Sequence, residues 1–330
     1  MTDPSKAPKV GIIVLNWNGK EDTSHCIESI EKIQYSNLEI VIVDNGSSDD
    51  SCATFKKKFP ACTLLETGKN LGYTGGNNVG IEYGLKQGFD YFLILNNDTI
   101  VDENIVEGFL EVFNSHPNAG VVGAKVYLMD DPERFDHLGG NWNSKTNRFD
   151  MVAHHILDDH KSFESPRELD YVVGAAIMID RTVIEKIGPL DARFFLYVDE
   201  TDFCYRAKNA GFSVISAPNA KIWHKVSASF FGGKPHSNYF ATRNRLLWIE
   251  NNLPRFQSYK KRAYLLGFGI PFYVKKIILK SLHVFLARIF SNKIQEEKIQ
   301  EIKIYDARLR GAIDYLTRSF GPGRLNKFFK

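Results

Sequence analysis

The feature that most constrains this chain is a repeated alternation of short apolar runs with longer, helix-like segments over its first 128 residues. Short runs rich in Val, Ile and Leu are typical of strands buried in a parallel sheet. They predict strands at about 10–15, 38–43, 63–66, 91–95 and 120–128, with helices at about 20–33 and 103–115 and a glycine-rich loop and helix after residue 66. This order predicts an α/β domain with a mostly parallel central sheet.

Polar side chains follow four of these strands, at the point where each strand ends. They are Asn16 and Asn18 after the first strand, Asp44 after the second, Asn70 and Asn77 after the third, and Asn96, Asn97 and Asp98 after the fourth. Ligands of open α/β sheets bind outside the carboxyl ends of the strands. One polar strand end is ordinary turn chemistry, whereas four in succession favour a ligand site.

The glycine-rich stretch at 67–88 is neither a GxGxxG fingerprint after the first strand nor a GxxxxGK[ST] loop. A Rossmann dehydrogenase and a P-loop NTPase are therefore disfavoured. The run Asn96-Asn97-Asp98 offers oxygen donors that suit Mg²⁺ or Mn²⁺ held jointly with substrate phosphates. An Asn-Asp turn without a metal has the same sequence.

Three carboxylates, Asp199, Glu200 and Asp202, follow an apolar aromatic run at 194–198 and open a helix-like segment that ends at a glycine, Gly211. Acids in a first turn can serve only as helix caps. Carboxylates against apolar surface have raised pKa values, which suit a general base. Both interpretations remain open from this stretch alone.

A further apolar strand at 169–181 is interrupted by small residues at Gly174-Ala175-Ala176. Small residues in a strand permit close approach of a ligand to the backbone, and they equally permit tight packing.

Composition limits the class of protein. The 43% hydrophobic and 25% charged content is ordinary for a globular chain, and a net charge of +3 is too small to imply a nucleic-acid partner. The four cysteines are scattered without a CxxC pair, so we expect neither a zinc site nor a disulfide framework. The polar N-terminus and the lack of a run of about 18 apolar residues predict a cytoplasmic protein without a spanning helix.

The pattern changes after about residue 226. The stretch 229–236, SFFGGKPH, is interpreted as a mobile lid or a linker. From Arg255 to Gln295 there are nine Lys or Arg and no Asp or Glu, with apolar segments between the charges. This pattern is typical of basic amphipathic helices at a membrane interface. The alternative is a helical subdomain whose apolar face packs on the catalytic domain or forms a homodimer.

With these pieces in order, the chain resembles the family 2 inverting glycosyltransferases of the GT-A fold, in the branch of rhamnosyltransferase-like and galactofuranosyltransferase-like enzymes. The matching motifs are IVLNWNG, IVIVDNGSSDDS, NLGYTGGNNVGI, YFLILNNDTI, the stretch from VGAAIMID to VDETDF, and WH, in the family's order over about residues 10–224. The resemblance implies a GT-A catalytic domain over 1–225 and a C-terminal helical region over 226–330, membrane-associating or dimerising.

The resemblance also implies site residues. Leu15, Asn16, Asn18, Asp44, Asn70 and Asn77 would hold the base and ribose of a nucleotide-sugar, with donor choice depending on contacts around Asp44, Asn77 and Gly174. Asn96 to Asp98 takes the place of the DxD motif, with Asn96 in place of its first acid. Asp98, Asn96 and His224 would bind Mg²⁺ or Mn²⁺. Glu200 falls on the catalytic base, where the family usually has Asp, so Asp199 and Asp202 remain rivals.

The activity implied is inverting sugar transfer from a dTDP- or UDP-sugar, with rhamnose as the leading sugar, to a glycan or lipid-linked glycan of a bacterial surface, at the inner face of the cell membrane. Two alternatives are a nucleotidyltransferase on a related fold and a non-catalytic nucleotide-sugar-binding or scaffold protein. The chain lacks the basic, glycine-rich signature that nucleotidyltransferases generally carry beside the first strand. Asn96 is the main support for the second.

Overall fold

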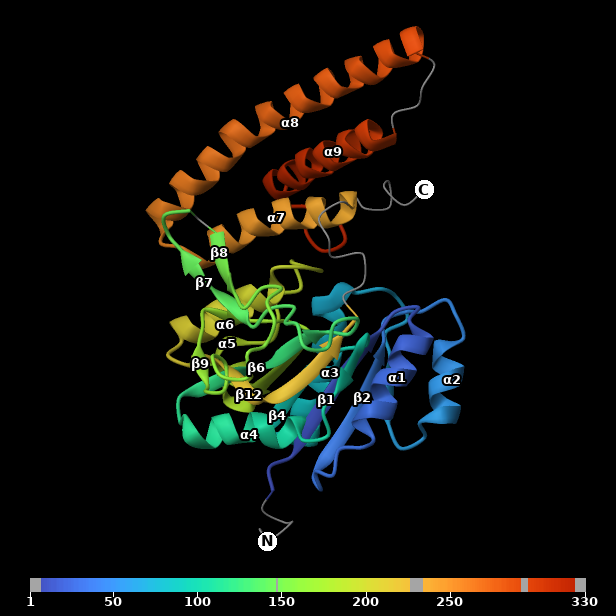
Figure 1. The fold of residues 1–330 in the computed structure, drawn as a ribbon, viewed down its shortest axis with the longest axis vertical. Coiled ribbons are helices and arrows are strands. Elements are labelled where there is room, and N and C mark those ends of the chain that lie inside the picture. The colour runs from blue at the N-terminus through green and yellow to red at the C-terminus, as the bar shows by residue number, and fades with distance from the viewer. Residues whose placement is uncertain (1–6, 147, 226–233, 292–295, 324–330) are drawn as a thin grey trace. The chain divides into compact units, whose positions relative to one another are not determined.

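The computed structural model describes residues 7–146, 148–225, 234–291 and 296–323 (Figure 1). The chain divides into two compact units, one of residues 1–191 and 200–226 and the other of residues 192–199 and 227–330. The short segment 192–199, which sequence analysis placed within the catalytic domain, therefore groups with the C-terminal unit.

The N-terminal unit is built on a nine-stranded sheet in the order β3-β2-β1-β4-β11-β6-β12-β5, with β9 paired to β12. Its strands are β1 (Val10–Asn16), β2 (Leu38–Asp44), β3 (Thr63–Glu66), β4 (Tyr91–Asn96), β5 (Thr99–Val101), β6 (Ala119–Leu128), β9 (Arg167–Glu168), β11 (Ala176–Asp180) and β12 (Ser213–His224). Pairings show that β1, β2, β3, β4, β6 and β12 run in one direction, and β5, β9 and β11 in the other. The predicted α/β class with a mostly parallel sheet is confirmed.

Two strands of a second, three-stranded antiparallel sheet lie in the stretch 130–168, where no strand was predicted. Its third strand falls within the single strand predicted at 169–181, which the structure divides between the two sheets. The second sheet pairs β10 (Tyr171–Val172) with β7 (Gly139–Asn143) and β7 with β8 (Arg148–Val152). These strands are short, and β8 is mostly exposed, so the two-residue alternation that marks a half-buried strand is weak there.

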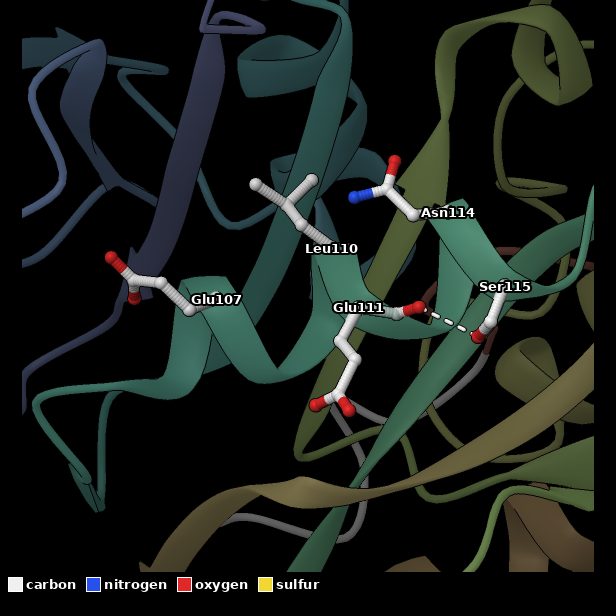
Figure 2. A pocket seen from close by; sticks show the side chains of 5 residues that line it. All are labelled: Glu107, Leu110, Glu111, Asn114 and Ser115. Atoms are coloured by element: carbon white, nitrogen blue, oxygen red, sulfur yellow. Dashed lines mark hydrogen bonds between the residues drawn. The ribbon is translucent and has the colours of Figure 1, made fainter. Parts of the chain in front are cut away.

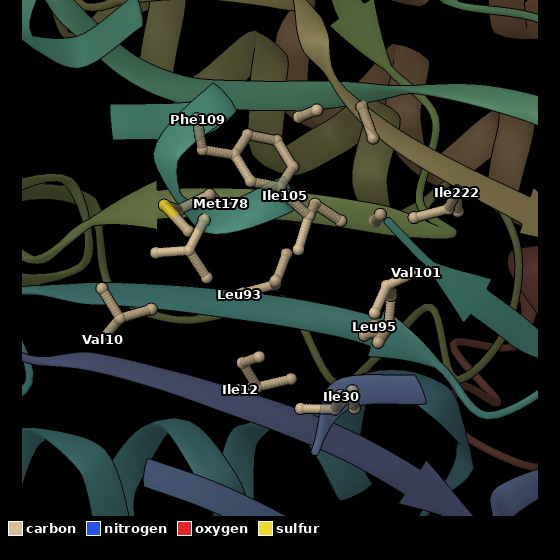
Figure 3. Packing of buried hydrophobic residues seen from close by; sticks show 14 of the residues in the cluster. Val10, Ile12, Ile30, Leu93, Leu95, Val101, Ile105, Phe109, Met178 and Ile222 are labelled. Carbon is tan, nitrogen blue, oxygen red and sulfur yellow. The ribbon is translucent and has the colours of Figure 1, made fainter. Parts of the chain in front are cut away.

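Helices of the N-terminal unit cover the large sheet. They are α1 (Lys20–Ile30), α2 (Ser51–Lys58), α3 (Gly72–Gln87), α4 (Ile105–Ser115), α5 (Arg181–Ile187) and α6 (Asp199–Asn209). Successive side chains of a strand point to opposite faces of the sheet. Ile12 therefore belongs to one apolar cluster with Ile105 and Phe109 of α4 (Figure 3). Ile13 belongs to a second cluster.

The C-terminal unit consists of α7 (Pro235–Asn252), α8 (Arg255–Ser291) and α9 (Glu296–Leu316), together with 192–199. Polar contacts tie its helices together: the Tyr239 hydroxyl donates to Asp314 at 2.6 Å, and Arg262 lies 3.1 Å from Glu250. Most of the predicted lid at 229–236 lies outside the described residues. None of the described helices combines the length and apolarity needed to cross a bilayer.

Candidate active site

Asp98 and His224, 126 positions apart in the sequence, come together because of one strand pairing. The chain turns after β4 at Asn96 and enters β5, which pairs antiparallel with β12 so that Thr99 lies opposite His224. This register places Asp98 beside the imidazole, with Asp98 Oδ1 3.2 Å from His224 Nε2. Asn96 Nδ2 lies 3.4 Å from the same ring nitrogen. The three residues predicted to hold a metal are thus neighbours.

Asp136 contacts the other side of the His224 ring, with its Oδ2 3.6 Å from Nδ1. Burial lowers the pKa of His224, but the neighbouring carboxylates of Asp136 and Asp98 outweigh this and raise it to about 9. Burial likewise opposes ionisation of Asp98, yet the contact with His224 holds the pKa of that carboxyl below its usual value. Two carboxylates thus flank one buried imidazole.

Sequence reasoning missed Asp136, because it lies outside any strand end. Its position depends on the loop that folds back along β6, where the Asp136 amide donates to the Val126 carbonyl at 2.8 Å. The isolated acid in RFDHLGG carries no local pattern from which this pairing could be found.

The donor set of this cluster fits a hard divalent cation. Adjacent ligands of an octahedral ion, each about 2.1 Å from it, lie about 3 Å apart, close to the 3.2 Å between Asp98 and His224. Asn96 can present its amide oxygen instead of its nitrogen, because the two ends of the amide are interchanged by a half-turn. Asn97 does not join the cluster: its amide donates to Thr23 Oγ1 at 2.9 Å.

Asn16 and Asp44 form a buried hydrogen-bond pair where β1 and β2 end. Asn16 Nδ2 donates to Asp44 Oδ2 at 2.8 Å, and Asn16 Oδ1 accepts from the Thr23 hydroxyl at 2.8 Å. Asp44 also accepts from the Ser47 amide at 2.9 Å. Since both side chains are almost fully buried, they organise the loops around the strand ends. Asn18, with φ 52°, extends this network by accepting from the Ser48 amide.

Leu15, Asn70 and Asn77 lie around the start of α3. A Cβ at Gly76 would come within 2.4 Å of Leu15 Cδ1, so α3 packs directly on the end of β1. Asn70 Oδ1 accepts from the Gly72 amide at 2.7 Å, and Asn77 Nδ2 donates to the Tyr73 carbonyl at 2.9 Å. These asparagines therefore shape the glycine-rich stretch.

Trp17 is a second residue that sequence reasoning passed over. It stands between Asn16 and Asn18 directly after β1, and its side chain is 55% exposed. An exposed indole at a strand end offers a flat apolar surface on which a ring can stack. The signal was present in NWNG, as a large aromatic residue inside a polar turn.

The three acids lie where α6 begins, as predicted, but their surroundings differ. Asp202 is fully buried and accepts from Arg206 Nε at 2.8 Å. Arg206 also donates to the carbonyls of Ile187 and Pro189. Asp202 thus belongs to a structural ion pair that ties α6 to the end of α5, which weakens its candidacy as a base.

Glu200 lies beside Gly174. A Cβ added at Gly174 would touch the Glu200 Cβ and Cγ at 3.4 Å, so the Glu200 side chain lies directly against this glycine. The Gly174 carbonyl accepts from the Tyr73 hydroxyl at 2.8 Å. Burial raises the pKa of Glu200 above its usual value. Gly174 has no side chain that could block the approach to Glu200. A carboxyl with a raised pKa in such a place is suited to accept a proton from a bound hydroxyl.

Other candidate sites carry less chemistry. One surface hollow runs along a face of α4, where the Ser115 hydroxyl donates to the Glu111 carbonyl (Figure 2), and its lining is Glu107, Leu110, Glu111, Asn114 and Ser115. Asp158, His160 and Glu164 could approach a metal, but Lys125 and the Tyr127 hydroxyl already contact the two acids. Neither place includes a residue of the predicted site.

Comparisons with known proteins show the family. The model of the family described as glycosyltransferase like family 2 matches residues 8–251. The low-salt glycan biosynthesis hexosyltransferase Agl10 of Haloferax volcanii is 27% identical over 214 residues, which are 62% of this chain and 63% of that protein. The N-acetylglucosaminyl-diphospho-decaprenol L-rhamnosyltransferase of Mycobacterium tuberculosis is 23% identical over 233 residues, 64% of this chain and 74% of that protein.

Among solved structures, the mannosyltransferase PcManGT from Pyrobaculum calidifontis, in complex with GDP-Man and Mn²⁺, matches with a TM-score of 0.56 at 14% identity. The match covers 95% of this chain and 88% of that chain. At this identity the likeness concerns the fold, and it confirms the predicted GT-A-like architecture.

Proposed function

The chain belongs to glycosyltransferase like family 2, and from this premise we propose that it is an inverting enzyme that moves a sugar from a dTDP- or UDP-sugar to a hydroxyl of a lipid-linked glycan. The observation that carries the proposal is the pairing of Asp98 with His224 at the sheet edge where β1, β2 and β4 end. Rhamnose is our leading sugar, because a relative from Mycobacterium tuberculosis is an L-rhamnosyltransferase.

Asp98, His224 and Asn96 would hold Mg²⁺ or Mn²⁺. The ion, when bound, neutralises charge on the donor's diphosphate and so makes the nucleoside diphosphate a better leaving group. Support comes from the donor set and from PcManGT, which was solved with Mn²⁺. Asp136 holds the far side of the His224 ring and so orients Nε2 toward Asp98.

Glu200 is our catalytic base. It accepts the proton of the acceptor hydroxyl while the acceptor oxygen bonds to the anomeric carbon and the bond from that carbon to the diphosphate oxygen breaks. Attack from the face opposite the leaving group inverts the configuration. The raised pKa of Glu200 supports this role, because a base with a pKa nearer the working pH transfers protons more effectively.

The base and ribose would lie over the ends of β1 and β2. We assign the contacts to Leu15, Asn18 and Asn70. Asn16, Asp44, Asn77 and Asn97 would order the loops, and Gly174 would admit the sugar. Trp17 joins this set as a stacking surface for the base.

The surface of α8 supports our proposal for where the acceptor lies. It exposes a stripe of large apolar side chains, namely Tyr264, Phe268, Ile278, Leu279, Leu282 and Phe285. Lys260 and Lys275 are exposed on the same helix, and the segment 255–295 has no acid. Cationic charge beside apolar surface complements an anionic lipid headgroup layer. We therefore place the protein at the inner face of a membrane, through α8.

The test is a panel of nucleotide-sugars screened for Mn²⁺-dependent thermal stabilisation. A ligand that binds only the folded state adds about 2.7 kcal/mol at a hundred times its dissociation constant. We expect one nucleotide family to stabilise the protein, and the effect to disappear on chelation and in Asp98→Ala. Binding with no transfer to any acceptor would favour the non-catalytic alternative, and pyrophosphate release from a nucleoside triphosphate would favour a nucleotidyltransferase.

A further inference from the structure

The backbone just before α6 adopts a conformation that needs support from outside. We call residues 193–198 the strap. Within it, Phe195, Tyr197 and Val198 have φ values of 67°, 68° and 68°. Left-handed backbone is unfavourable for bulky and β-branched residues, and it persists only where surrounding structure determines it. Some part of the molecule must therefore hold the strap.

Two adjacent residues of α7 supply that support. Arg243 Nη2 donates to the Arg193 carbonyl at 3.2 Å and to the Phe194 carbonyl at 2.9 Å. Asn244 Nδ2 lies within 2.9 Å of the Phe194, Leu196 and Tyr197 carbonyls. Both side chains are completely buried. Their polar groups thus bind carbonyls of the irregular strap, which lies in neither a helix nor a sheet.

The two residues also fix each other, because Arg243 Nε donates to Asn244 Oδ1 at 3.0 Å. This contact orients the asparagine amide so that its nitrogen faces the strap. Arg243 Nη1 donates to the Gly321 carbonyl at 2.7 Å, and the Gly321 amide donates to the Arg193 carbonyl at 3.1 Å. Aromatic packing adds to the hold: the Phe195 ring stacks on Phe240, with centroids 5.6 Å apart. The strap is bound on several sides within the C-terminal unit.

The strap leads directly into the proposed base. Residues 192–199 group with the C-terminal unit, and the chain re-enters the N-terminal unit at Glu200. The last carbonyl held by Asn244, that of Tyr197, is therefore three residues before Glu200. Since α6 begins at Asp199, the path of the strap determines where the first turn of that helix starts.

We propose that Arg243 and Asn244 are positioning residues for sugar transfer: by holding the strap carbonyls they set the first turn of α6, and with it Glu200, the second residue of that helix. The inference rests on the proposed role of Glu200. Arg243 and Asn244 are not among the residues that we assign to the donor or to the metal. Their loss should affect the chemical step and leave donor binding unchanged.

The experiment compares Asn244→Ala and Arg243→Lys with Tyr315→Phe. Tyr315 is a buried phenol of the same unit whose hydroxyl contacts Arg262 and Glu250 and no strap carbonyl. A misplacement of about 1 Å can lower turnover by about 10²-fold. We expect kcat to fall by roughly 10- to 100-fold in the first two variants, with the donor KM within about twofold of wild type, whereas Tyr315→Phe keeps its kcat.

Amide hydrogen exchange gives a second readout that does not require turnover. Exchange of the amides at 195–202 should quicken in Asn244→Ala and Arg243→Lys and stay unchanged in Tyr315→Phe. Unchanged kcat and unchanged exchange in the first two variants overturn the inference, as does an equal loss of kcat in all three. If Asn244→Ala does not fold, Arg243→Lys carries the test. If the wild-type protein transfers no sugar, the proposed function is wrong. The exchange data would still show whether α7 holds the strap.

Discussion

Glu200 is a carboxyl whose burial opposes its ionisation, at the first turn of a helix that opens with acids. Its folded-state pKa lies above the ordinary value of 4.5. Its contribution to stability is thus present below pH 4.5 and is lost as the pH rises through the folded pKa. Above pH 4.5 this group therefore costs the fold stability, a compromise that suits the base we propose.

Glu200→Gln should therefore be more stable than wild type at neutral pH, with this advantage disappearing below pH 4.5, because glutamine cannot ionise. Turnover should fall by about 10²- to 10⁴-fold. Urea unfolding across pH and a transfer assay measure the two effects. Asp199→Asn is the matched variant: loss of turnover there, with Glu200→Gln active, would move the base to Asp199.

Asp202 differs from Glu200 in having a charged partner, Arg206, one helical turn away. Asp202→Ala leaves the guanidinium without that carboxylate, so we expect the free energy of unfolding to fall by about 3 kcal/mol. The control is Glu185→Ala, because Glu185 and Arg181 form an i,i+4 pair that is exposed. There the loss should be about 0.5 kcal/mol. Equal losses in urea titrations of the two variants would contradict the structural role of Asp202.

At the scale of elements, β12 joins the site to the core. It ends at His224 and runs beneath α4, where a Cβ on Gly108 would come within 2.5 Å of the Asn219 backbone. Backbone atoms cannot move aside as a flexible side chain can. Because α4 approaches β12 so closely, position 108 requires glycine.

Gly108→Ala should destabilise the protein by about 1–3 kcal/mol through overpacking. Gly267→Ala is the control, since an added Cβ in that part of α8 meets nothing within 4 Å. Alanine has the higher helix propensity, so that variant should be neutral or more stable by up to about 1 kcal/mol. Thermal unfolding distinguishes the two; an undiminished melting temperature in Gly108→Ala would show that α4 can shift.

At the scale of the whole molecule, the exposed stripe of α8 bears on which acceptors the protein can reach. The triple variant Phe268→Ser, Ile278→Ser and Leu282→Ser should lose sedimentation with phosphatidylglycerol vesicles, because it removes apolar surface that inserts among headgroups. Transfer to a lipid-linked acceptor in vesicles should fall, while transfer to a water-soluble acceptor should not.

Met151→Ser with Leu157→Ser is the control, since those side chains are 50% and 57% exposed on the N-terminal unit. High salt should weaken vesicle binding of the wild type. If the wild type does not bind vesicles but forms a dimer, and the triple variant is a monomer, the stripe is a subunit interface.

Much of the fold could be predicted from the sequence. The apolar runs predicted five of the six strands that run in one direction, β1, β2, β3, β4 and β6, and missed β12. The acids at 199–202 marked the start of α6. Strand periodicity, turn chemistry and helix caps are encoded within a few neighbouring residues. The family motifs then predicted the GT-A class. The short strands β7 and β8 were not predicted, because they bury too few side chains to show the alternation of apolar and polar residues typical of a strand.

The sequence by itself determined which chemical groups stand at the strand ends and in what order. Only the tertiary structure decided which of them meet. Asp98 reaches His224 through the pairing of β5 with β12, and Asp136 joins them from a loop. The segment 192–199 groups with helices that follow it by more than 30 residues. Such contacts depend on the order of strands and the packing of helices, which no local stretch of sequence encodes.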